Sequence, residues 1–146
     1  MTRIESGTIR MAESDDDIRR CFPVMLELRS HLDDAEGFLR RVRRQIPEGY
    51  RLVLLEEADE VRAVCGFRIF SSLADGRVMH VDDLVTDGMQ RSRGFGDRLF
   101  DWLVDHARDE RCDRLRLDSG VQRFAAHRFY LRKRMSIVAH HFVLEF

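Results

Sequence analysis

The chain has 146 residues, a length that fits one domain and leaves no room for a second. Hydrophobic residues make up 44% and charged residues 35%, a balance typical of a folded globular protein and unlike that of a disordered chain. The formal net charge of -1 counts against nucleic acid or an anionic membrane as the partner. No apolar run approaches the roughly 18 residues of a membrane-spanning helix, and the N-terminus lacks the apolar segment of a secretory signal. We therefore expect a cytoplasmic protein without a membrane partner.

The cysteines and histidines predict no metal site. Cys21, Cys65 and Cys112 form no CxxC motif and no metal-ligand spacing, and each lies in an apolar pattern. This pattern favours buried free thiols in a reducing compartment. His140 and His141 are adjacent in a predicted strand, so their rings would point to opposite faces and could not share a metal.

The N-terminal third of the chain predicts one short strand and two helices. The strand is expected over 8–11. Ser14, followed by three aspartates, is typical of a helix start, because a capping hydroxyl precedes carboxylates at the positive end of the helix dipole. Apolar residues then recur at helical spacing over 18–32, with a kink expected at Pro23. A second helix is predicted over 38–46.

The remaining chain alternates strands and helices within a single domain of residues 1–146. Its alternating and helical patterns predict, in order, strands over 50–56, 61–71 and 78–86, a helix from 94, a strand at 115–117, a helix over 121–131 and a strand over 136–146. The resulting order, β-α-α-β-β-β-α-β-α-β, predicts an α/β fold with a mixed sheet and helices on both faces.

A glycine-containing segment, Gln90-Arg91-Ser92-Arg93-Gly94-Phe95-Gly96, lies between a predicted strand and a predicted helix. A helix start presents unpaired amide groups that bind phosphate, and glycines allow a ligand to approach the backbone closely. Leu99 fills the third glycine position of the dinucleotide-binding motif, and no Walker sequence follows. The alternative is an ordinary glycine-containing turn with solvated arginines.

The motif Arg91-x-x-Gly94-x-Gly96 after a strand resembles the acetyl-CoA-binding motif of the GNAT superfamily of N-acetyltransferases. The preceding run 82–87 looks like that family's fourth strand, and Phe129-Tyr130 matches its later helix. The resemblance covers nearly the whole chain in element order and is specific over about 78–135. It implies a mostly antiparallel sheet of six or seven strands, split near its middle where CoA enters.

The resemblance also implies which residues bind acetyl-CoA as co-substrate. Backbone amides from Arg91 to Gly96 would hold the pyrophosphate, and main-chain groups of the fourth strand would meet the pantetheine arm. The full implied set is Leu84, Val85, Thr86, Arg91, Ser92, Arg93, Gly94, Phe95, Gly96, Ser119 and Phe129. Asp83 interrupts an otherwise apolar strand face, so a β-bulge is predicted there.

The resemblance makes Tyr130 the predicted general acid, which would donate a proton to the departing CoA sulfur. The alternative is an ordinary amphipathic residue at a helix end. His80 stands where some relatives carry a catalytic glutamate, and histidine has a suitable pKa for a general base. A packed or solvated strand histidine is the alternative to that role. Asp82 and Asp83 are rival bases, and either could instead bind a cationic substrate.

These roles imply transfer of an acetyl group from acetyl-CoA to a primary amine, an acyltransferase reaction. Direct attack in a ternary complex is expected, because no cysteine lies near the motif. The acceptor could be a small cationic amine or an amine of a protein or peptide. The acidic residues Asp33, Asp34 and Glu36 could bind a cationic acceptor or form a solvated loop. Aminoacyl-tRNA is a further acceptor used by relatives, against which the near-neutral charge counts. The rival function is a non-catalytic acyl-CoA-binding sensor or structural module, and a relic of the fold without CoA binding is a third reading.

The C-terminal region contains one departure from the family motif and one candidate surface for self-association. Arg134-Met135 replaces a glycine-aromatic pair that relatives often carry, which puts the geometry of the turn after Tyr130 in doubt. A sheet edge near Phe142, Leu144 and Phe146 could pair in a homodimer.

Overall fold

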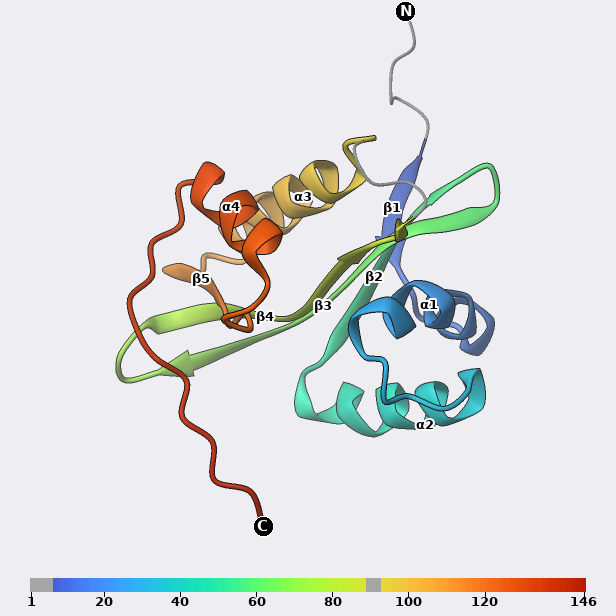
Figure 1. Ribbon diagram of the computed structural model, residues 1–146, viewed down its shortest axis with the longest axis horizontal. Helices are drawn as coiled ribbons and strands as arrows, with labels where there is room; N and C mark the ends of the chain where they lie inside the picture. Colours follow the sequence, from blue (N-terminus) through green and yellow to red (C-terminus); the bar gives the residue numbers. More distant parts are fainter. Residues whose placement is uncertain (1–6, 89–92) are drawn as a thin grey trace, which may run out of the picture. The chain divides into compact units, whose positions relative to one another are not determined.

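The computed structural model describes residues 7–88 and 93–146 (Figure 1). The chain divides into two compact units, 1–116 and 117–146. In the part of the chain that the structure describes, the first unit contains most of the sheet and three α-helices, and the second contains one α-helix and the C-terminal segment. Within the described ranges, no helix is both long and apolar enough to cross a membrane.

The sheet has five strands in the spatial order β1-β2-β3-β4-β5. The first four strands pair antiparallel with their neighbours, which confirms the mostly antiparallel character predicted from the sequence. The strands are β1 (Thr8–Met11), β2 (Arg51–Glu57), β3 (Glu60–Ser72), β4 (Gly76–Thr86) and β5 (Arg114–Leu117). The expected count of six or seven strands was wrong.

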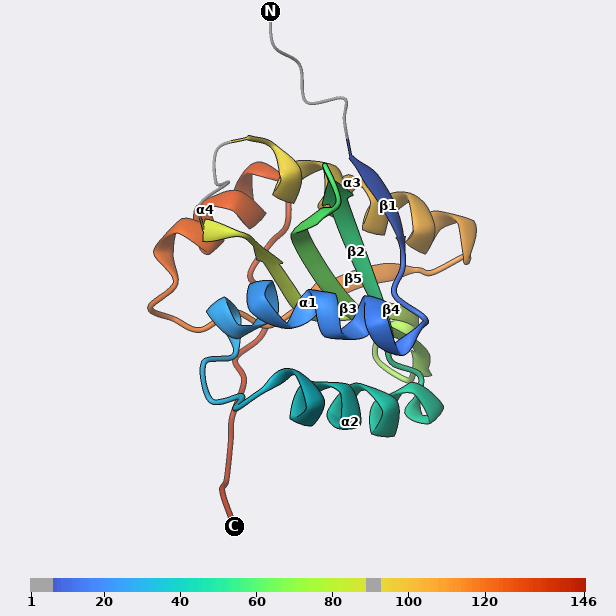
Figure 2. The ribbon, with the colours of Figure 1, turned by 90° about the vertical axis from the view of Figure 1, so that its right-hand side faces the viewer.

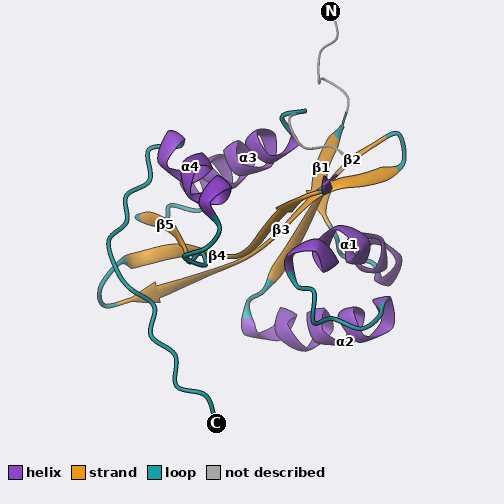
Figure 3. Ribbon diagram, in the orientation of Figure 1, coloured by secondary structure: helices purple, strands orange, loops and turns teal. Residues whose placement is uncertain are grey.

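The missing strand is the one predicted over 136–146, which forms no regular structure and is drawn as loop in Figure 3. Alternating apolar residues satisfy the pattern of a strand, but a strand also needs a neighbouring backbone to bond with. Side chains that such a strand would bury are open to solvent, with Phe142 91% and Leu144 79% exposed. These residues, with Phe146, therefore lie on an irregular segment and not on a sheet edge, so the predicted edge for a homodimer was wrong.

Two helices cover one face of the sheet in the first unit (Figure 2). α1 (Asp15–Leu28) begins as predicted, because Ser14 Oγ accepts a hydrogen bond of 3.1 Å from the amide of Asp17. The helix continues through Pro23 and ends before the predicted residue 32. α2 (Ala35–Gln45) is capped by Asp34 and is followed by the short 3₁₀-helix η1 (Ile46–Glu48). The core that these helices form with the sheet includes Ile18, Met25, Phe38, Val42, Leu52, Leu54 and Val64.

α3 (Phe95–Asp109) packs on the opposite face of the sheet (Figure 2). Its buried stripe is Phe95, Leu99, Phe100, Leu103 and Ala107. The ring of Trp102 lies 6.3 Å from that of Phe67 on β3, measured between centroids. The prediction of helices on both faces of the sheet is confirmed.

A β-bulge interrupts β4 at the predicted place. Gly66 of β3 lies opposite Asp83, whereas the next residue, Phe67, lies opposite Val81. Asp82 is therefore the extra residue of β4, and the regular ladder with β3 is broken there. The polar run that interrupts the apolar face of this strand is explained by this irregularity.

The second unit contains α4 (Phe124–Arg132). The helix ends in a two-bond turn, in which the amide of Met135 donates to Tyr130 O and that of Arg134 donates to Leu131 O. Arg134 has a φ of 68°, which is the left-handed conformation that glycine adopts most easily. The chain thus makes this turn with an arginine in the left-handed position.

Candidate functional site

The predicted phosphate-binding segment lies at the junction of β4 and α3. Arg91 and Ser92 fall outside the described residues. Gly94 precedes the first residue of α3 with a φ of 85°, a conformation that glycine adopts without strain. A Cβ on Gly96 would lie 3.0 Å from Thr86 Oγ1, so the start of α3 and the end of β4 approach closely. The first amides of α3 are donors that the helix itself cannot satisfy, which suits an anion.

The side chain of Arg93 is engaged within the protein. It forms a bidentate ion pair with Glu57 at the end of β2, with distances of 2.8 and 3.1 Å. Its guanidinium also lies over the ring of Phe95, 4.8 Å from the centroid. The positive charge of Arg93 is therefore balanced by a carboxylate, and the side chain ties the β2–β3 hairpin to the start of α3.

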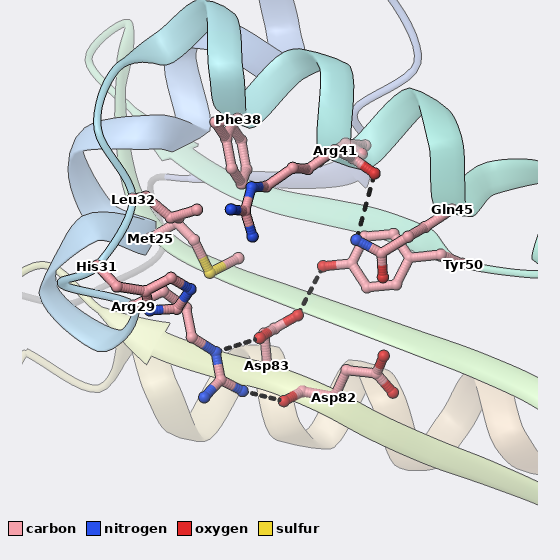
Figure 4. Close-up of a pocket in the computed structure, with 11 residues that line it drawn as sticks. Met25, Arg29, His31, Leu32, Phe38, Arg41, Gln45, Tyr50, Asp82 and Asp83 are labelled. Carbon is pink, nitrogen blue, oxygen red and sulfur yellow. Dashed lines mark hydrogen bonds and ion pairs between the residues drawn. The ribbon is translucent and has the colours of Figure 1, made fainter. Parts of the chain in front are cut away.

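A cavity of about 290 Å³ opens beside the bulge of β4, between α1, α2 and the sheet (Figure 4). Ligand pockets begin at about 300 Å³, so this space suits a small group. It is lined by Met25, Arg29, His31, Leu32, Phe38, Arg41, Val42, Gln45, Tyr50, Asp82 and Asp83. One wall is apolar and the other carries the two bulge carboxylates.

Asp83 is held from two sides. The hydroxyl of Tyr50 donates to its Oδ2 at 2.7 Å, and Arg29 Nε donates to its Oδ1 at 2.8 Å. Arg29 also donates to the backbone carbonyl of Asp82 at 2.7 Å. Burial, together with the charge of Asp83, raises the pKa of Tyr50 well above its usual value of 10, so the phenol stays protonated and donates. Arg29 thus joins the C-terminal end of α1 to the bulge.

Asp82 has a separate partner. Its Oδ2 accepts a hydrogen bond of 2.8 Å from Arg68 Nε, on β3. Arg68 in turn donates to Gln45 at 2.5 Å and lies 5.4 Å from the centroid of the Tyr50 ring. Each bulge carboxylate therefore has its own arginine, and neither carboxylate presents an uncompensated charge.

His80 lies two residues before the bulge and is not among the residues that line the cavity. Arg116 Nε donates to its Nδ1 at 3.1 Å, which fixes Nδ1 as an acceptor in this arrangement. Arg116 also pairs with Asp75 at 2.5 Å. Of the residues predicted as bases, the structure thus places the two aspartates in the cavity and His80 outside it.

Tyr130 belongs to the second unit, where it is half-buried on α4. Burial raises the pKa of its phenol, and a hydrogen bond with Arg123 opposes that change. The ring of Phe129 meets that of Tyr130 edge-on, with 5.6 Å between centroids. Ser119, in the same unit, has a buried hydroxyl oxygen without a hydrogen-bond partner in the described part of the chain.

Of the three acidic residues singled out near the start of α2, Asp34 and Glu36 have structural partners. Asp34 Oδ1 accepts the amide of Gly37 at 2.7 Å and caps α2, and Glu36 pairs with Arg19 at 2.7 Å. Neither residue lines the cavity. Tyr50 and Arg29 could not be recognised as site residues from the sequence, because their roles depend on contacts across the fold and no local motif marks them.

Comparisons with known proteins show the family and the fold. The sequence model described as the acetyltransferase (GNAT) family matches residues 13–135. An uncharacterized N-acetyltransferase of Bacillus subtilis, YhdJ, is 36% identical over 126 residues, which is 86% of this chain and 88% of that protein.

Two solved structures have the same fold. The glucosamine-6-phosphate N-acetyltransferase of Arabidopsis thaliana has a TM-score of 0.75 and 23% identity, covering 97% of this chain and 99% of that one. The ribosomal-protein-alanine N-acetyltransferase of Brucella melitensis has a TM-score of 0.80 and 15% identity, covering 97% of this chain and 100% of the other.

Proposed function

Since the chain belongs to the GNAT family of acetyltransferases, we propose that it transfers an acetyl group from acetyl-CoA to a primary amine. The observation that carries this proposal is the bulge at Asp82, which interrupts the sheet next to a cavity and shortly before the glycine-containing start of α3. The relatives with assigned substrates acylate the nitrogen of an amino sugar or of a protein alanine. Both acceptors are primary amines, which supports the reaction class without choosing the acceptor.

The residues at the end of β4 and the start of α3 fit acetyl-CoA as co-substrate. Leu84, Val85 and Thr86 would offer main-chain groups to its pantetheine arm, and the amides following Gly94 would hold its pyrophosphate. Arg91 and Ser92 would complete this set, with Phe95 and Gly96 as its last members. When bound, acetyl-CoA supplies the activated acetyl thioester. Ser119 and Phe129 of the second unit are proposed to contact it as well.

Tyr130 is the proposed general acid, which donates its phenolic proton to the departing sulfur. Its raised pKa supports this role, because the phenol then stays protonated at neutral pH. An amine attacks only when neutral, so an acceptor for its proton is also needed. Asp82 is the proposed acceptor, directly or through a water, because it lies on the bulge and in the cavity. His80 is the alternative proton acceptor.

The test is a thiol-release assay with acetyl-CoA and a panel of amines, run beside the Tyr130→Phe variant. The panel contains polyamines, aminoglycosides, amino acids, amino sugars, and peptides with free N-termini or lysines. Turnover that falls about 100-fold in the variant, while acetyl-CoA still raises the melting temperature of both proteins, supports the proposal. Thermal stabilisation without turnover on any amine would favour a non-catalytic acyl-CoA-binding module instead.

A further inference from the structure

The charged side chains that line the cavity are not all paired with one another. Asp83 is paired with Arg29 and Asp82 with Arg68, so the two carboxylates that line the cavity are both neutralised. Arg41 also lines the cavity, where His31 and Tyr50 are the other titratable side chains besides these pairs. Since other arginines pair with both carboxylates, the side of the cavity at Arg41 carries a local positive charge, opposite in sign to what a cationic acceptor would need there.

The local positive charge at Arg41 has no ionic partner among the residues that the structure describes. In the described ranges, 7–88 and 93–146, its guanidinium takes part in no ion pair and no hydrogen bond, whereas Arg43 on the same helix pairs with Asp15 at 2.5 Å. Figure 4 shows the guanidinium of Arg41 directed into the cavity, on the side of Phe38 and Met25. Arg41 is exposed, so a ligand can reach its guanidinium, which can form bidentate, charge-assisted hydrogen bonds with a carboxylate or a phosphate.

We propose that the acceptor is a small amine that also carries an anionic group, a phosphate or a carboxylate, which Arg41 binds. This inference rests on the proposed acetyl transfer and names its substrate class. The bulge side of the cavity, with Asp82, is then left for the amine. Polyamines and aminoglycosides, which carry several positive charges and no anion, would meet the unpaired charge of Arg41 and are poor acceptors.

The experiment compares acceptors in matched pairs that differ only in the anion. Glucosamine 6-phosphate is measured against glucosamine for the phosphate arm, and an amino acid against its amide for the carboxylate arm. KM and kcat are determined for the wild type, Arg41→Gln and Arg40→Gln. Arg40→Gln is the matched control, because it removes the same charge from an adjacent exposed residue of α2 that does not line the cavity.

We expect the anionic member of at least one pair to be the better substrate, and Arg41→Gln to raise its KM about tenfold with little change in kcat. The KM of the neutral member should not change in either variant. Whichever arm responds identifies the anion. Equal effects of Arg41→Gln on both members of a pair, or the same effect from Arg40→Gln, would overturn the proposal.

A binding measurement separates this inference from the acetyl transfer on which it rests. Glucose 6-phosphate and acetate have no amine to acylate. Their binding can therefore be measured by titration calorimetry whether or not the protein transfers acetyl groups. Binding of either anion that weakens about tenfold in Arg41→Gln, and not in Arg40→Gln, supports the anion site even if no amine is acetylated. Anion binding without acetylation of any amine would refute the proposed reaction and would leave the anion site supported. Absence of any Arg41-dependent anion binding would overturn the inference.

Discussion

The phenol of Tyr50 lies directly over Gly66, where a Cβ would be 1.8 Å from Tyr50 Oη. Gly66 is the β3 residue that faces Asp83 across the ladder, and Asp83 accepts the hydrogen bond of that same phenol. The absence of a side chain at Gly66 thus lets Tyr50 cross one strand to reach the bulge of the next. One wall of the cavity depends on this crossing.

Replacing Gly66 with alanine should therefore displace Tyr50. The new methyl group would overlap both the hydroxyl and the ring, and overpacking of this kind costs about 1–3 kcal/mol of unfolding free energy. Chemical denaturation followed by circular dichroism measures the loss. The KM for the acceptor should rise as well, because Asp83 loses a partner.

The Tyr50→Phe variant separates the hydrogen bond from the packing. It keeps the ring and removes only the hydroxyl, so we expect a loss of about 1–2 kcal/mol, owing to the buried Asp83 oxygen left without its donor. If Gly66→Ala were as stable as the wild type, the close approach of Tyr50 would not be needed to fold this face of the sheet.

Two arginines have a left-handed backbone conformation, and replacing either with glycine should stabilise the protein. Arg134 and Arg111 have φ values of 68° and 58°, and each follows a helix in the same two-bond turn. Arg134→Gly should raise the unfolding free energy by about 1 kcal/mol, because glycine adopts this conformation without strain. Thermal unfolding measures the gain, and Arg111→Gly should reproduce it after α3. Lower stability of both variants would show that the arginine side chains contribute more than the strain removes.

The order of elements could be predicted from the sequence because local patterns determine it. Serine and aspartate caps set the starts of α1 and α2, and alternating apolar residues defined β2, β3 and β4. The strand predicted over 136–146 was wrong, because alternation alone does not supply a partner for the backbone. A strand forms only where an unpaired edge of a sheet is available to bond with it, and a local sequence pattern does not encode whether such an edge is available.

An ion-pair network predicts how stability changes with pH. Arg10 and Arg20 donate hydrogen bonds to Asp17 and Glu56, and these bonds lower the pKa of both carboxyl groups. The unfolded chain titrates near the ordinary values of about 4. The contribution to stability is therefore complete above that pH and is lost as the pH falls through the lower folded values.

Denaturation between pH 6 and about pH 3 tests this dependence. The Glu56→Gln variant should lose less stability on acidification than the wild type, since one of the responsible carboxyl groups is gone. Asp105→Asn, at an exposed position of α3, is the control and should follow the wild type. Identical acid profiles for Glu56→Gln and the wild type would contradict the assignment.

A substitution at the start of α3 should selectively weaken the binding of acetyl-CoA. Gly94 has a φ of 85°, so Gly94→Ala strains the backbone by about 1 kcal/mol and moves the first amides of the helix. We expect the Kd for acetyl-CoA, measured by calorimetry, to rise about tenfold or more. Gly49→Ala, at a φ of 103° with open space around it, carries similar backbone strain away from the site and should leave the Kd unchanged. Equal Kd values in Gly94→Ala and the wild type would remove these amides from the CoA site.

The candidate site was only partly predictable. The glycine motif and the bulge could be anticipated, because Gly94 follows a strand and Asp83 interrupts an apolar face. The pairing of Arg29 with Asp83 joins residues 54 positions apart, and Arg41 is one of four arginines between positions 40 and 44. Which of those arginines lines a cavity depends on how α2 packs, and a single sequence does not specify that packing.

Acetyl-CoA labelled in its acetyl group tests whether the protein transfers acetyl to an amine. The protein is incubated with acetyl-CoA labelled in the acetyl group and with the anionic amines described above, and the products are separated by mass. We expect labelled N-acetyl product and free CoA thiol in equal amounts. The rate of acetyl transfer should be about 100-fold lower in the Tyr130→Phe variant. Free thiol without labelled amine, or no consumption of acetyl-CoA with any acceptor, would contradict it.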